Sequence, residues 1–167
     1  TARHRLIVVP ASHWCGLANA PESLASFVTP NTPALRELLL AASARLQQST
    51  GNGALDGYLS KSAERTQLIA EACYQSLAER GIVYIVAQPS FEEQGQKVRN
   101  AAEVLADGAG NCLDLSVTLA AILEAAGLAP AIAIGDGHAV VSFATTDDQF
   151  SDAIHEGASR MANRIEL

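Results

Sequence analysis

The segment of residues 111–143 constrains the fold most, because it joins a well-capped apolar helix to a hairpin signal. Asn111 stands where a helix begins, and Asp114 follows three residues later, which is the spacing of a capping box. Gly127 is expected to end this helix. Between these points apolar residues recur at helical spacing and predict one buried stripe: Leu115, Leu119, Ile122, Leu123 and Ala126.

Two short β-rich runs follow that helix, at residues 131–134 and 139–143. The sequence Gly135-Asp136-Gly137 between them is typical of a tight hairpin turn. The other expected elements are helices at 32–50, 62–80, 101–106 and 150–161, strands at 5–9, 82–86 and 165–167, and loops at 13–31 and 89–100. Because helices come first and a helix with a hairpin follows, we expect an α+β fold.

The length of 167 residues favours a single domain over residues 1–167. We divide it into an N-terminal strand and loop (1–31), a helical part (32–94) and the part that carries the last helix and the hairpin (95–167). The net charge is −7, which argues against partners such as nucleic acid or an anionic membrane. The longest apolar runs are far shorter than the roughly 20 residues of a membrane helix, and no secretion signal is recognised, so we expect a cytoplasmic chain.

Three cysteines are too few and too widely spaced for a disulfide framework, which fits a reducing compartment. Cys73 falls on the apolar stripe of the second predicted helix, and Cys15 lies beside Trp14, so both are expected to pack against neighbours. The four histidines do not pair with one another or with cysteines at zinc-ligand spacing. No nucleotide-binding motif is present, and we therefore expect neither a metal nor a cofactor.

Cys112 and His138 are the candidate catalytic residues. Cys112 lies in the first turn of a predicted helix, where free amide groups and the helix dipole stabilise a thiolate. The preceding Gly108 and Gly110 would allow a substrate backbone to approach closely. His138 opens a strand directly after a tight turn, in a part of the chain expected to pack on the same helix. A thiol with an imidazole beside it is a nucleophile and base for acyl transfer.

Four sequence segments around these residues are familiar in combination: 96–105 (QKVRNAAEVL), 110–114 (GNCLD), 123–128 (LEAAGL) and 137–140 (GHAV). With Cys112 and His138 separated by 26 positions, they resemble the transglutaminase-like cysteine enzyme superfamily. The closest resemblance is to domains of this kind within larger bacterial proteins. It covers most of the chain from about residue 24 and is strongest from 95 to 143.

The resemblance implies a papain-like core, in which a helix with Cys112 at its N-terminus packs on an antiparallel sheet that carries His138. It implies thiol-dependent acyl transfer that needs no cofactor. The implied substrate is a protein or peptide, which includes other domains of the parent protein. We favour hydrolysis, by a peptidase or amidase, over transamidation, because water is always available and nothing indicates an amine site. The alternatives are a catalytically inactive binding module and a structural domain that positions its neighbours.

The third catalytic residue stays open at this point. Family members with a full triad carry an acid after the His strand, and the choices here are Glu166, Asp152 or a residue beyond Leu167. Asp136 is too close to the turn. The main-chain N–H groups of Asn111 and Cys112 are expected to hold the oxyanion. Gln96 is a candidate for a further donor, although we expect it to be a solvated loop residue.

Overall fold

The computed structural model describes residues 8–135, 137–147 and 154, and within them the chain is α+β. The helical elements are η1 (Pro21–Phe27), η2 (Pro33–Leu35), α1 (Arg36–Thr50), α2 (Ala63–Ala78), α3 (Phe91–Gln94), α4 (Ala101–Asp107) and α5 (Cys112–Ala125). The strands are β1 (His13–Trp14), β2 (Val83–Tyr84), β3 (Gln96–Lys97), β4 (Ala109–Gly110), β5 (Pro130–Gly135) and β6 (His138–Phe143). No helix among these residues is long and apolar enough to span a membrane.

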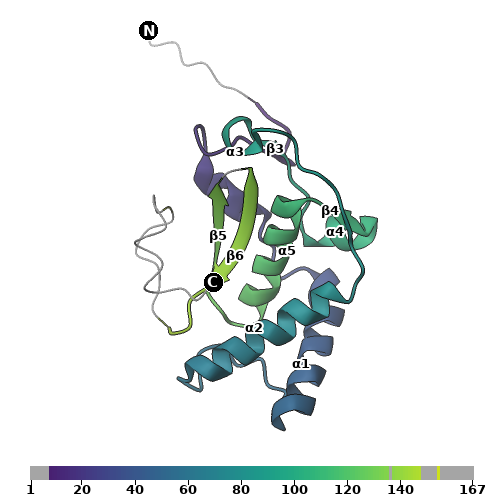
Figure 1. Cartoon of the computed structure of the whole chain (residues 1–167), viewed down its shortest axis with the longest axis vertical. Helices are drawn as coiled ribbons and strands as arrows, with labels where there is room; N and C mark the ends of the chain where they lie inside the picture. Colours follow the sequence, from purple (N-terminus) through teal and green to yellow (C-terminus); the bar gives the residue numbers. More distant parts are fainter. Residues whose placement is uncertain (1–7, 136, 148–153, 155–167) are drawn as a thin grey trace.

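The strands form three two-stranded sheets in the described residues. β5 and β6 make the longest pair, an antiparallel hairpin in which Gly135 lies opposite His138. β1 pairs antiparallel with β3, and β2 pairs parallel with β4, so both of these short sheets join distant segments of the chain. In Figure 1 the hairpin lies along α5, while α1 and α2 pack together at one end of that helix.

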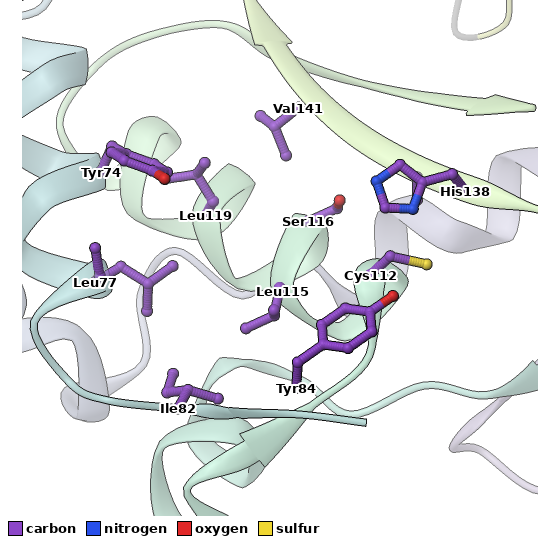
Figure 2. Close-up of a pocket in the computed structure, with 12 residues that line it drawn as sticks. Tyr74, Leu77, Ile82, Tyr84, Cys112, Leu115, Ser116, Leu119, His138 and Val141 are labelled. Carbon is purple, nitrogen blue, oxygen red and sulfur yellow. The ribbon is translucent and has the colours of Figure 1, made fainter. Parts of the chain in front are cut away.

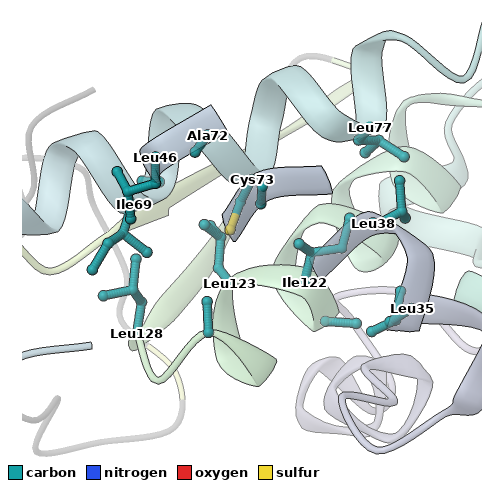
Figure 3. Packing of buried hydrophobic residues seen from close by; sticks show 14 of the residues in the cluster. Leu35, Leu38, Leu46, Ile69, Ala72, Cys73, Leu77, Ile122, Leu123 and Leu128 are labelled. Atoms are coloured by element: carbon teal, nitrogen blue, oxygen red, sulfur yellow. The ribbon is translucent and has the colours of Figure 1, made fainter. Parts of the chain in front are cut away.

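Helix α5 contributes to both hydrophobic clusters of the described chain. Its C-terminal half, with Ile122 and Leu123, packs among α1 and α2 in the larger cluster (Figure 3). Its N-terminal half, with Leu113 and Val117, packs with Trp14 and other residues before α5 in the smaller cluster. Because both clusters are built on α5, this helix is the central element of the fold.

The structure confirms the predicted helices at 32–50, 62–80 and 101–106, the helix that follows Asn111, and the hairpin, with ends shifted by a few residues. Ser62 caps α2 by accepting a hydrogen bond from the Arg65 N–H at 3.2 Å, and Gly51 ends α1 with a left-handed φ of +76°. The expected strand at 82–86 is reduced to the two residues of β2. The predictions at 150–161 and 165–167 lie outside the described residues, as does most of the expected strand at 5–9.

Both expected loops contain regular structure, so those two predictions are wrong. The segment 13–31 holds β1 and η1, and the segment 89–100 holds α3 and β3. The physical reason is long-range pairing: His13 lies opposite Lys97 and Trp14 opposite Gln96, and neither partner has a local sequence pattern that predicts a strand.

Gly95 makes this pairing possible because there is no room for a side chain. Its φ is +78°, and a Cβ at this position would overlap the carbonyl oxygen of Trp14 on the neighbouring strand. Gly51 has nearly the same φ of +76°, but no atom lies within 4 Å of the position of its Cβ. A substitution at Gly51 therefore costs backbone strain alone, whereas the same substitution at Gly95 costs backbone strain and a steric clash.

We predict that Gly95→Ala lowers the free energy of unfolding by more than about 3 kcal/mol, because strain and overlap add. Gly51→Ala should cost only the strain of a left-handed residue, about 1 kcal/mol. Urea denaturation of both variants measures the difference. Equal losses would contradict the close approach of β1 to Gly95.

Candidate active site

Cys112 is the first residue of α5, and its position is set by the cap of that helix. Asn111 is the N-cap, and its Oδ1 accepts hydrogen bonds from the N–H groups of Leu113 and Asp114, both at 3.0 Å. The predicted capping box is therefore present. Cys112 is only 4% exposed, and it belongs to the smaller hydrophobic cluster.

Asp114 carries the reciprocal half of the cap and is fully buried. Its carboxylate accepts hydrogen bonds from the Asn111 N–H at 3.2 Å, from the Arg99 N–H at 2.8 Å and from Arg99 Nη1 at 2.9 Å. The Arg99 guanidinium also contacts Asp107, an exposed residue at the end of α4. Arg99 thus supplies the positive charge that lets a carboxylate sit buried two residues from Cys112.

Gln96 is buried at 2% exposure, which corrects our expectation of a solvated loop glutamine. The pairing of β1 with β3 places it opposite Trp14, which is fully buried. Its Nε2 donates to Asn111 Oδ1 at 3.4 Å, and the side chain does not line the pocket described below. Gln96 therefore contacts the helix cap and lies outside the pocket lining.

One further expectation about the segment before Cys112 is corrected. The Asn111 N–H already donates to the Asp114 carboxylate, so it is not free to hold an oxyanion. A Cβ at Gly110 would lie 3.2 Å from the Cβ of Asp114, whereas a Cβ at Gly108 would meet no atom within 4 Å. The Cys112 N–H remains as the main-chain donor at the start of α5.

Cys112 and His138 line the same pocket, which has a volume of about 300 Å³ (Figure 2). Cys112 enters it from the start of α5, and His138 from the start of β6. Ser116, one turn after Cys112, also lines it. The rest of the lining is apolar apart from two tyrosines: Tyr74, Leu77, Ala78, Ile82, Tyr84, Leu115, Leu119, Ala139 and Val141.

Leu115 and Leu119 belong to the stripe that was expected to be buried, and they are only half-buried. Helical periodicity shows which residues share a face, but it does not show whether a neighbouring element closes over them. Here the space between α5, α2, β2 and β6 is not filled, and the two leucines line the pocket instead.

Tyr84 is a residue that the sequence reasoning missed. Its hydroxyl points towards Cys112 in Figure 2. Partial desolvation raises the pKa of Tyr84, and the charge of an ionised Cys112 and a side-chain hydrogen bond to it raise that pKa further. A hydrogen bond from the Cys112 main-chain N–H lowers it. The Tyr84 hydroxyl therefore lies beside both the thiol and the N–H of Cys112.

The other predicted residues lie apart from this pocket. Cys73 is fully buried in the larger cluster, as expected, and burial raises the pKa of its thiol to about 12. Cys15 is half-buried, and neither it nor His13 lines the pocket. Among the described residues no cluster of three His, Cys, Asp or Glu side chains is placed to hold a metal ion.

The candidate third residues Asp152 and Glu166, like Asp136, lie outside the described residues. Over the part of the chain that is described, no hydrogen bond or ion pair joins the His138 ring to another side chain. The acid that would orient His138 therefore stays unassigned.

Searches against protein-family models, curated proteins and solved structures find no match to this chain.

Arg99 contacts two carboxylates, and removing each in turn tests whether its ion pair with Asp114 stabilises the cap beside Cys112. Asp114→Ala should lower the free energy of unfolding by about 3 kcal/mol or more, because it leaves Arg99 and the Asn111 N–H without their buried acceptor. Asp107→Ala removes the other carboxylate on the same arginine, but that side chain is 56% exposed and its loss should cost less than about 1 kcal/mol. Chemical denaturation measures both, and similar losses would show that the buried network does not stabilise the cap.

Proposed function

We propose that Cys112 and His138 form the nucleophile and base of a cysteine peptidase or amidase with a papain-like core. The observation that carries this proposal is that a thiol at a helix N-terminus and an imidazole at a strand start line one pocket. The resemblance of residues 96–105, 110–114, 123–128 and 137–140 to transglutaminase-like enzymes supports it independently. The substrate is a protein or peptide amide.

In the proposed reaction, His138 takes the proton of the Cys112 thiol, and the sulfur attacks the substrate carbonyl carbon. The new S–C bond gives a tetrahedral oxyanion, which collapses as the C–N bond breaks. His138 returns its proton to the leaving amine, and an acyl-enzyme thioester remains. Water then attacks the thioester, passes a proton to His138, and releases a carboxylic acid and the regenerated thiol. His138 is exposed, so water reaches the thioester directly.

In this proposal the oxyanion replaces the Tyr84 oxygen as the acceptor of the Cys112 N–H, and the Tyr84 hydroxyl then donates to it. The two groups lie next to each other at the start of α5, and neither belongs to the Asn111–Asp114 cap. Tyr84 is held there by the pairing of β2 with β4, in which Tyr84 lies opposite Gly110, two residues before Cys112. Donors fixed in this way stabilise charge that develops in the transition state.

The first prediction of this proposal concerns thiol reactivity at neutral pH. Iodoacetamide should alkylate Cys112 at least about tenfold faster than Cys15 or Cys73, because Cys112 lies at a helix N-terminus and shares its pocket with the proposed base His138. Peptide mass spectrometry after timed quenching measures all three rates in one sample. His138→Gln should slow the reaction at Cys112, whereas His13→Gln, a histidine outside the pocket, should leave it unchanged. A Cys112 rate equal to that of Cys15 would refute the nucleophile assignment.

The second prediction separates Tyr84 from the thiolate. Tyr84→Phe should lower kcat for hydrolysis of a fluorogenic peptidyl amide by about a hundredfold, because one oxyanion donor is lost. The alkylation of Cys112 by iodoacetamide should not slow, since displacement of iodide forms no oxyanion. A parallel fall in both rates would mean that Tyr84 acts on the thiol rather than on the oxyanion.

A binding module that has lost catalysis is the second candidate. It is the alternative that the sequence leaves open, because the candidate acids Asp152 and Glu166 lie outside the described residues. It predicts that the three cysteines react in the order of their exposure, with half-buried Cys15 fastest, and that His138→Gln changes nothing. The alkylation experiment therefore decides between the two candidates.

A further inference from the structure

The pocket extends well beyond the two proposed catalytic side chains. Cys112, Leu115 and Leu119 lie on one face of α5 and form its floor. The seven steps from Cys112 to Leu119 span about 10 Å along a helix axis at 1.5 Å per residue. In Figure 2 Cys112 and His138 stand at one end of this floor and Tyr74 at the other. An occupant attached to Cys112 thus has room to extend along α5.

The walls of the pocket are apolar and come from three other elements. Ile82 and Tyr84, alternate residues around β2, form one wall, and Val141 of β6 forms the other. Ala78 of α2 also lines the pocket, as does Tyr74 of the same helix. No Lys, Arg, Asp or Glu lines the pocket among the described residues. A charged side chain would therefore lose its hydration here without gaining a partner, whereas an apolar one gains by burial.

The main chain of Tyr84 offers a place for a peptide backbone next to this pocket. Val83 and Ile85 donate their N–H groups to the carbonyl oxygens of Gly108 and Gly110, at 2.9 Å each. Main-chain groups alternate in direction along a strand, so the N–H and C=O of Tyr84 face away from β4. Within the described residues β2 has no partner on that edge. An extended peptide can form two hydrogen bonds there, as strands added to sheet edges do.

We propose that the site takes an extended polypeptide segment, which pairs with the open edge of β2 at Tyr84 and places a bulky apolar side chain between α5, β2 and β6. This inference rests on the proposed function for the position of the scissile amide at Cys112. Specificity comes from the size of the buried apolar side chain, and charged side chains are excluded.

The test uses dipeptidyl chloromethyl ketones, which alkylate a thiol through one common reactive group. The probes are acetyl-Gly-Gly, acetyl-Phe-Gly, acetyl-Gly-Phe and the acidic analogues with Glu in place of Phe. The second-order rate constant for Cys112 is measured by mass spectrometry. One of the two Phe probes should react at least about tenfold faster than the Gly-Gly probe, because its ring is buried. The Glu probe of the same position should show no gain.

A variant and a matched control locate the effect in the pocket. Ala78 is exposed at the end of α2 and lines the pocket, so Ala78→Phe fills the space without disturbing the core. It should bring the Phe/Gly rate ratio close to 1. Ala44 is an exposed alanine of α1 outside the pocket, and Ala44→Phe should keep the ratio of the unmodified chain. N-methylation of the Phe residue in the faster probe should slow it at least about fivefold, because the bond to the β2 edge is lost.

The outcomes separate this inference from the proposed function. The Phe/Gly ratio compares probes with the same reactive group, so it does not depend on how reactive the thiol is. A ratio near 1 in the unmodified chain, or an equal gain for Glu, would overturn the apolar subsite even if iodoacetamide reacts rapidly with Cys112. A slow reaction with iodoacetamide together with a high Phe/Gly ratio would overturn the proposed catalysis and leave a peptide-binding pocket. An N-methylated probe that keeps its full rate would overturn the pairing with β2.

Discussion

The cap of helix α5 is the interaction on which the rest of the structure depends. The Asn111 side chain and the Asp114 carboxylate bond each other's main-chain N–H groups, and Arg99 neutralises the buried acid. Gln96 adds a hydrogen bond to Asn111 from the strand that pairs with β1. The start of α5 is thus bound to segments that precede it in the chain. The cap fixes the position of Cys112, although the Cys112 side chain makes no hydrogen bond to it.

The same helix explains why a pocket forms beside Cys112. At its C-terminal half α5 packs against α1 and α2, and Ile122 and Leu123 are buried. Towards the N-terminal half α2 ends at Ala78, and β2 and β6 stand on either side without closing over Leu115 and Leu119. The pocket is therefore a gap in the covering of α5, open at the point where the helix dipole favours negative charge.

Local signals made the helices and the hairpin predictable, because capping residues and helical spacing act within one or two turns. Ser62, Asn111 and Gly51 all stand where their chemistry requires. The short strands were not predictable, since β1 and β3 are held by a partner more than 80 residues away. Gln96 was expected in solvent for the same reason. Tyr84 was missed because its hydroxyl meets Cys112 only through the pairing of β2 with β4.

The sharing of α5 between two hydrophobic clusters has a consequence for how the molecule opens. Unfolding of α5 breaks both clusters, so the amide hydrogens of its middle turns should exchange with solvent only when the whole chain unfolds. Cys73 is fully buried in the larger cluster, which packs on the C-terminal half of α5, whereas Cys112 lies at the N-terminus of this helix. The Cys73 thiol becomes accessible only in molecules that have unfolded, whereas Cys112 faces the pocket in the native state. The reactivity of the Cys73 thiol therefore reports global unfolding, and the reactivity of the Cys112 thiol reports the pocket of the folded chain.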